Sequence, residues 1–168
     1  EELDTHGGSL RIWACHCSDL RPDAPGLTLV RQKERDFGIS TYKTYHGLTK
    51  QAETVRQNLT KFLYATKNEK KTVAGYGAAA KGNTLLNYCK LTTREVEFVV
   101  DANPHKQGTW LPGSHIPVEP IAALEKNRPD YIIILPWNIA TEIISACSFV
   151  RGWGGQFVTA IPQLKVLP

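Results

Sequence analysis

Residues 73–90 read VAGYGAAAKGNTLLNYCK, and this stretch decides the fold. A short apolar run leads into Gly75-x-Gly77-x-x-Ala80, and a helical pattern of small and then larger apolar residues follows. This is the order of a dinucleotide-binding loop, in which a strand ends in glycines that open a helix. We predict that Gly75 allows the tight turn and that Gly77 lets the backbone approach a ligand. Ala80 would replace the third glycine and keep helix and strand close.

Strand and helix patterns alternate through the rest of the chain. The run 130–136, DYIIILP, is apolar from residue 131 onward and does not alternate, as a strand buried on both faces of a parallel sheet requires. Such alternation predicts an α/β fold with a Rossmann-like parallel sheet and flanking helices. The expected strands are 71–77, 95–101, 116–120, 130–136 and 154–162, and the expected helices between them are 78–90, 121–128 and 137–150.

Two further elements are expected before this sheet. Residues 9–15, SLRIWAC, alternate apolar and other side chains and predict an N-terminal strand, followed by a loop rich in proline. Apolar residues at steps of three and four predict a long amphipathic helix over 41–66, weakened at Gly47.

Composition limits the classes of partner. The net charge is +4, and 20 Lys and Arg are scattered among 16 Asp and Glu, so we expect no nucleic-acid partner. No apolar run is long enough to span a membrane, and the chain opens without a signal-peptide pattern, so we expect a cytoplasmic protein without membrane contact. The spacing Cys15-x-Cys17 does not fit structural zinc. We expect no metal site and four buried free thiols.

Polar residues follow two of the expected strands, where open α/β sheets bind ligands. Asp101 ends the strand 95–101, at the place of a ribose-binding acid, and Asn103 follows it. Trp137 and Asn138 follow the strand 130–136 and would stack on a base or sugar and donate or accept hydrogen bonds. The alternative is that these two residues only open a helix and pack on its neighbour.

Lys81 lies in the first turn of the helix after the glycines, where the helix dipole disfavours a cation unless an anion binds. This favours a phosphate ligand over the sulfonium of S-adenosylmethionine, and the alternative is a lysine that extends into solvent. His6, in THGGSLR, is a further candidate site residue, with a solvated terminal histidine as the alternative. No acid pair or nucleophile–base spacing indicates catalysis, so we expect no catalytic residue in this chain.

Four stretches occur in the order THGGSLR, GYGAAAKGNTLLN, VVDANPHKQG with LPGSHIPV, and YIIILPWN. Together they resemble the C-terminal region of S-adenosylmethionine-dependent sugar C-methyltransferases, over approximately residues 4–168. Those enzymes act on nucleotide-linked deoxysugars such as dTDP-linked keto-sugars. The resemblance implies a small zinc-binding N-terminal domain and a middle methyltransferase domain as partners within one longer chain.

The resemblance also implies a division of labour. In the intact enzyme, a base of the middle domain would remove a proton beside a keto group, and the enolate would attack the methyl group of S-adenosylmethionine. The middle domain's cofactor loop and its Tyr-x-Glu-His stretch are not found here, and the chain contains no methionine. We therefore expect a fragment that is inactive alone. Residues 1–36 would be a remnant of the junction with the methyltransferase domain, with a strand that frays or pairs with another edge, and 37–168 the nucleotide-sugar-binding domain.

The substrate-binding residues that the resemblance implies are Gly75, Gly77, Lys81, Asn83, Asp101, Asn103, Trp137 and Asn138. The deoxyribose of dTDP lacks the 2′-hydroxyl, so Asp101 would contact the ribose, orient the loop or contact the sugar. Two other functions stay open: an NAD(P)-binding module or oxidoreductase, which Asp101 and the loop favour, and a structural scaffold that binds no ligand.

Overall fold

The computed structural model describes residues 1–167, apart from the side chain of His6. The chain divides into two compact units, Glu1–Gln51 and Ala52–Pro168. This division does not test the predicted assignment of 1–36 to a methyltransferase-domain junction, which stays a prediction.

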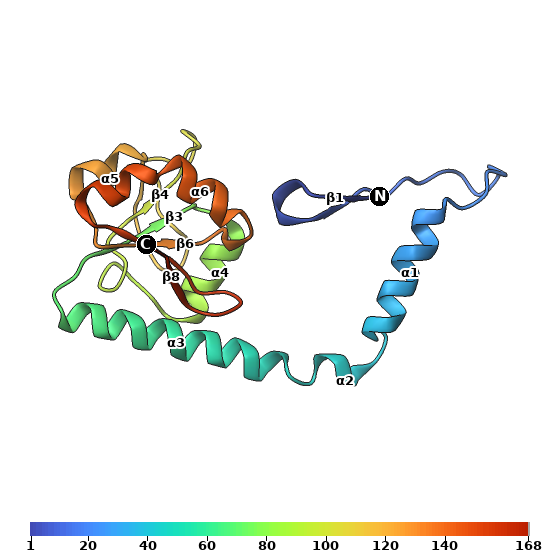
Figure 1. The fold of residues 1–168 in the computed structure, drawn as a ribbon, viewed down its shortest axis with the longest axis horizontal. Helices are drawn as coiled ribbons and strands as arrows, with labels where there is room; N and C mark the ends of the chain where they lie inside the picture. The colour runs from blue at the N-terminus through green and yellow to red at the C-terminus, as the bar shows by residue number, and fades with distance from the viewer. Residues whose placement is uncertain (168) are drawn as a thin grey trace. The chain divides into compact units, whose positions relative to one another are not determined.

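The second unit contains a six-stranded sheet in the order β5-β4-β3-β6-β7-β8 (Figure 1). Neighbouring strands are parallel except for β8, which is antiparallel to β7. The strands are β3 Val73–Tyr76, β4 Val99–Val100, β5 Val118–Glu119, β6 Tyr131–Ile134, β7 Gln156–Thr159 and β8 Lys165–Leu167. The prediction of a Rossmann-like parallel sheet is confirmed, and the strand order reverses between β3 and β6, where such sheets bind ligands.

Helices cover both faces of the sheet. On one face, α3 (Leu48–Asn68) and α4 (Ala80–Tyr88) bury leucines against β3 and β4. On the other face lie α5 (Ala122–Asn127), α6 (Ala140–Ala146) and the 3₁₀ helix η3 (Ser148–Trp153). Ile133 belongs to the first core, and Ile132 and Ile134 belong to the second. Both faces of β6 are therefore buried, as its run of apolar residues predicts.

Several element boundaries differ from the expected ones. The helix expected over 41–66 is two helices, α2 (Tyr42–Tyr45) and α3, separated at residues 46–47. The helix expected over 137–150 is divided into η2 (Trp137–Ile139), α6 and η3. The strand β8 was not predicted, because a three-residue edge strand with two exposed members carries a weak pattern.

The first unit contains a two-stranded sheet in which β1 (Glu2–Leu3) pairs with β2 (Ser9–Leu10) across the 3₁₀ helix η1 (Thr5–Gly7). The strand expected over 9–15 thus ends at residue 10 and, as expected, lies outside the six-stranded sheet.

The helix α1 (Pro25–Phe37) was missed because proline and glycine at 25–26 indicate a loop. Pro25 instead occupies the start of the helix, where its missing N–H costs nothing. None of the described side chains of α1 is buried.

The four cysteines are free thiols in two environments. Cys89 and Cys147 are buried, whereas Cys15 and Cys17 are exposed, so the expectation of four buried thiols is wrong for that pair. Cys15 and Cys17 lie in the segment between β2 and α1, in which no residue is buried. Within the described part of the chain, no helix has the length and hydropathy to cross a bilayer.

Candidate functional site

The turn after β3 is made at Gly77, which has φ of +93°. A Cβ atom on Gly77 would lie 2.6 Å from the Cδ of Pro136, so this glycine is required by its conformation and by the proline ring. Gly75 lies inside β3, where a Cβ would meet Val99 Cγ2 at 2.8 Å. The prediction that Gly75 allows the tight turn is therefore wrong. Gly75 instead leaves room for the side chain of Val99 on the next strand. Close approach of a ligand to Gly77 stays a prediction.

Close packing between helix and sheet depends on Gly82 rather than on Ala80. Ala80 is exposed and Gly82 is buried. A Cβ atom on Gly82 would lie 2.6 Å from Leu135 Cβ, just after β6. The prediction that Ala80 keeps helix and strand close is therefore wrong, because Gly82, two positions later, makes that contact. The sequence feature that could have indicated this contact is a glycine inside a helical pattern, which often has a packing reason.

Lys81, Trp137 and Asn138 come together at the carboxyl ends of β3 and β6. The Lys81 Nζ lies 4.9 Å from the centre of the Trp137 ring and donates a hydrogen bond to Asn138 Oδ1. Both partners are neutral, and no carboxylate among the described residues forms an ion pair with Lys81. The alternative of a lysine that extends freely into solvent does not describe this geometry. The positive charge of Lys81 is held in place but not neutralised.

Asp101 follows β4 directly and is only 8% exposed. Its Oδ2 accepts hydrogen bonds from the Ala78 N–H at 2.8 Å and from Lys106 Nζ at 3.1 Å. Its Oδ1 accepts a hydrogen bond from the Asn103 N–H at 2.8 Å. The carboxylate therefore connects the glycine loop to the segment after β4.

The two other asparagines predicted for the site make local hydrogen bonds. The Asn83 Oδ1 accepts a bond of 3.2 Å from Asn87 Nδ2, one turn along α4. The Asn103 Oδ1 accepts a bond of 3.0 Å from the His105 N–H, in a turn that folds the segment back on itself. Contact of either side chain with a ligand stays a prediction. The side chain of His6 lies outside the described residues, so its predicted role is untested.

Three participants were not among the predicted site residues. Lys106 pairs with Asp101, Gln107 Nε2 donates a bond of 2.9 Å to the Asp101 carbonyl, and Pro136 fills the space beside Gly77. A cation five positions after a strand-end acid could have indicated the first contact. Tyr76, at the end of β3, is half-buried, and this burial raises the pKa of its phenol.

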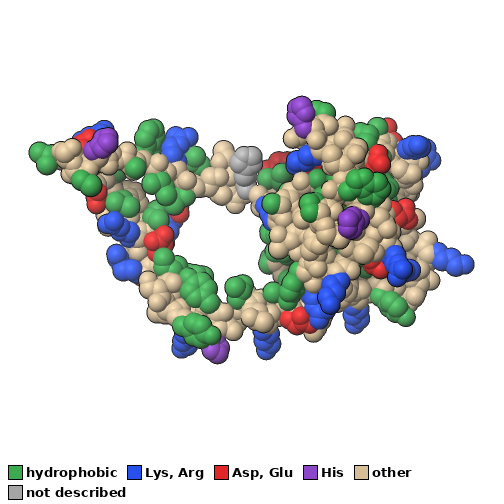
Figure 2. All heavy atoms as spheres, turned by 180° about the vertical axis from the view of Figure 1, so that it is seen from behind, with side chains coloured by type: hydrophobic (Ala, Val, Ile, Leu, Met, Phe, Trp, Pro, Cys, Tyr) green, Lys and Arg blue, Asp and Glu red, His purple; other side chains and the backbone are tan. Residues whose placement is uncertain are grey.

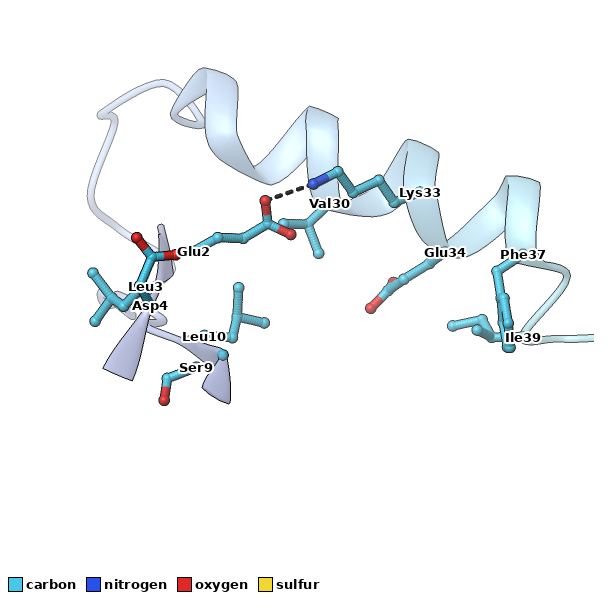
Figure 3. A pocket seen from close by; sticks show the side chains of 11 residues that line it. Glu2, Leu3, Asp4, Ser9, Leu10, Val30, Lys33, Glu34, Phe37 and Ile39 are labelled. Atoms are coloured by element: carbon cyan, nitrogen blue, oxygen red, sulfur yellow. Dashed lines mark hydrogen bonds and ion pairs between the residues drawn. The ribbon is translucent and has the colours of Figure 1, made fainter. Parts of the chain in front are cut away.

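Surface hollows lie elsewhere. One of about 650 Å³ belongs to the first unit, where Leu10 of β2 and Val30 and Phe37 of α1 line it beside an ion pair of 2.5 Å between Lys33 and Glu2 (Figure 3). Another, of about 520 Å³, lies beside β5 and α5. Among the side chains that the structure describes, none of those predicted for the site lines either hollow. On the face shown in Figure 2, Lys and Arg side chains are interspersed with Asp and Glu.

Two comparisons with known proteins identify the family of this chain. The sequence model of the family described as "C-methyltransferase C-terminal domain" matches residues 4–162. The chain is also 35% identical over 164 residues to the C-methyltransferase NovU of Streptomyces niveus. That match covers 98% of this chain and 39% of the relative, so the chain spans well under half of that protein's length. The chain belongs to the family of C-methyltransferase C-terminal domains.

Proposed function

We propose that this domain binds a nucleotide-linked keto-deoxysugar for a longer C-methyltransferase. Another part of that protein would bind S-adenosylmethionine and transfer its methyl group to the sugar. The observation that carries the proposal is the position of Lys81, which Trp137 and Asn138 hold at the point where the strand order reverses. This chain would contribute orientation of the substrate, and the chemical step would belong to the other part.

The start of α4 is suited to an anion. The N-cap residue is Ala79, which has no side-chain acceptor for the free N–H groups of the first turn. The first turn carries Lys81 and no acid, although the dipole favours acids there. A diphosphate would accept hydrogen bonds from these N–H groups and pair with the lysine. The cation of S-adenosylmethionine would be repelled by the same charge, so these residues fit a sugar nucleotide and not that cofactor.

Trp137 gives this anion site an apolar side. Its ring already holds the Lys81 ammonium group at 4.9 Å, and it is partly exposed. An aromatic face beside a cation is suited to a sugar or base that is attached to a phosphate. The position of the aromatic ring therefore supports a nucleotide sugar more than inorganic phosphate.

The alternative of an NAD(P)-binding module depends on Asp101, whose carboxylate would have to bind the ribose hydroxyls. In this structure Asp101 is buried and accepts hydrogen bonds from Ala78, Asn103 and Lys106. This arrangement does not favour the ribose contact that defines dinucleotide modules.

The test is calorimetric titration of this chain with a dTDP-linked sugar, NAD and S-adenosylmethionine in parallel. We expect the dTDP-sugar alone to bind, and Lys81→Ala to weaken it by about tenfold or more, as loss of a charge-assisted hydrogen bond requires. Lys61→Ala is the matched control, because Lys61 is an exposed lysine on α3. It should leave the affinity unchanged.

Each other result has a definite meaning. Preferential binding of NAD would support the dinucleotide module instead. Failure of all three ligands to bind would favour the scaffold function. Equal affinities of the Lys81→Ala and Lys61→Ala variants for the dTDP-sugar would contradict the proposal that its diphosphate binds at the start of α4.

A further inference from the structure

We infer that the nucleotide site does not read the ribose 2′-hydroxyl, because Asp101 is a positioning residue for the glycine loop and not a ribose ligand. The site should therefore bind 2′-deoxyribonucleoside and ribonucleoside diphosphates equally well. This inference rests on the proposed function and specifies the nucleotide class that the site accepts.

The first step of the argument is the capacity of the carboxylate. A carboxylate has about four lone-pair positions for hydrogen bonds. Three are taken, by the Ala78 N–H, the Asn103 N–H and Lys106 Nζ, at 2.8, 2.8 and 3.1 Å. A ribose diol needs two acceptor positions, so it would have to displace one of these donors.

The second step is access. The side chain of Asp101 is 12% exposed, whereas that of its partner Lys106 is 42% exposed. Little of the carboxylate is accessible to solvent, and Lys106 and the Asn103 N–H both form hydrogen bonds with it. Gln107 closes the turn that begins at Asn103 by donating to the Asp101 carbonyl at 2.9 Å. A ribose hydroxyl could reach Asp101 only if this segment opened.

The third step is what the carboxylate does instead. Ala78 lies three residues before Lys81, in the loop between Gly77 and α4. The bond from its N–H to Asp101 holds that loop against the segment after β4. The position of Lys81 thus depends on Asp101 through the loop that Ala78 belongs to. Loss of the carboxylate should weaken every diphosphate by the same factor.

The experiment compares two nucleotides that differ only at the 2′ position, dTDP and 5-methyluridine 5′-diphosphate, by calorimetry on the whole chain. We expect the unmodified chain to bind both with affinities within about twofold, which is less than 0.5 kcal/mol. In Asp101→Asn, one backbone N–H loses its acceptor, so both affinities should fall by an equal factor. Hydrogen exchange at the Ala78 and Asn103 amides should become faster in that variant, with or without nucleotide.

Several results would overturn the inference. A tenfold preference of the unmodified chain for the ribonucleotide would do so while leaving the proposed function standing, and it can be measured even if Asp101→Asn does not fold. Unchanged amide exchange in a folded Asp101→Asn variant would contradict the positioning role. Failure of both nucleotides to bind the unmodified chain would refute the proposed function, and the inference with it.

A second variant, Lys106→Met, keeps the carboxylate of Asp101 and removes the ammonium group that forms an ion pair with it. We expect its ratio of the two affinities to stay near one, because Ala78 and Asn103 still occupy Asp101. A ribonucleotide preference that appears only in this variant would contradict that expectation, because it would show that the bonds from Ala78 and Asn103 do not by themselves keep the ribose from Asp101. A preference already present in the unmodified chain would overturn the inference, as above.

Discussion

A Cβ atom on Gly82 would lie 2.6 Å from the Cβ of Leu135, so the first turn of α4 lies directly against the residue that follows β6. Lys81 precedes Gly82, and Trp137 and Asn138 follow Leu135 by two and three residues. This close approach lets Lys81 reach both of them. The absence of a side chain at Gly82 thus contributes to bringing the candidate site together.

Gly82→Ala should destabilise the domain. Alanine favours a helix over glycine by about 1 kcal/mol, but the new methyl group overlaps a buried leucine, and overpacking costs about 1–3 kcal/mol. We expect a net loss of up to about 2 kcal/mol in the free energy of unfolding, measured with urea. Gly152→Ala is the control, because a Cβ there meets nothing within 4 Å. A Gly82→Ala variant as stable as Gly152→Ala would contradict the packing argument.

Trp137→Leu should weaken binding of a dTDP-linked sugar by about three- to tenfold. The substitution keeps an apolar side chain but removes the ring that faces Lys81 Nζ, an interaction worth about 0.5–2 kcal/mol. Trp137→Phe should retain most of the affinity. Trp110→Leu, at an exposed tryptophan outside the candidate site, serves as the control in the same titration. Equal effects of the leucine substitutions at 137 and 110 would count against a role for Trp137.

The stability of the domain should fall between about pH 9 and pH 11. Burial raises the pKa of the Cys89 thiol from 9.0 to about 11. Below pH 9 the thiol is protonated in the folded and the unfolded chain, so its contribution is fully present. As the pH rises further, the unfolded chain loses this proton first, and the stabilisation is lost.

This pH effect can be assigned by comparing slopes. We expect the free energy of unfolding in urea to decline less steeply with pH in Cys89→Ala than in the unmodified chain. Cys17→Ala, at an exposed thiol, should keep the original slope. Burial also raises the pKa values of Cys147 and Tyr76, so part of the decline should remain in Cys89→Ala. Identical slopes in all three proteins would show that Cys89 does not contribute.

Residues 48–168 should fold without the preceding segment. Every buried side chain among the described residues belongs to position 59 or later, and α3 begins at Leu48. We expect the free energy of unfolding in urea to differ by less than about 0.5 kcal/mol between the shortened chain and the full chain. A loss of more than 2 kcal/mol would show that residues 1–47 contribute to the stability of the sheet.

Local patterns were sufficient for most of the sheet. The apolar run at 131–135 predicted a strand buried on both faces, and the glycines after residue 74 predicted a strand-to-helix turn. These features can be predicted from neighbouring residues, because burial and backbone conformation favour a regular pattern of residue types along the chain. Where the repeat is short, prediction failed: β8 has three residues, and α1 begins with a proline that also suits a loop.

The sequence by itself determined the α/β class, the place of the glycine turn and the register that puts Asp101 at a strand end. Only the tertiary structure decided which polar groups meet. Lys81 and Asn138 are 57 positions apart, and Ala78 and Asp101 are 23 apart. The order of the strands brings each pair together, because parallel strands end at one edge whatever their distance along the chain. The partner of a polar side chain, and hence its role, depends on that order and not on the residues beside it.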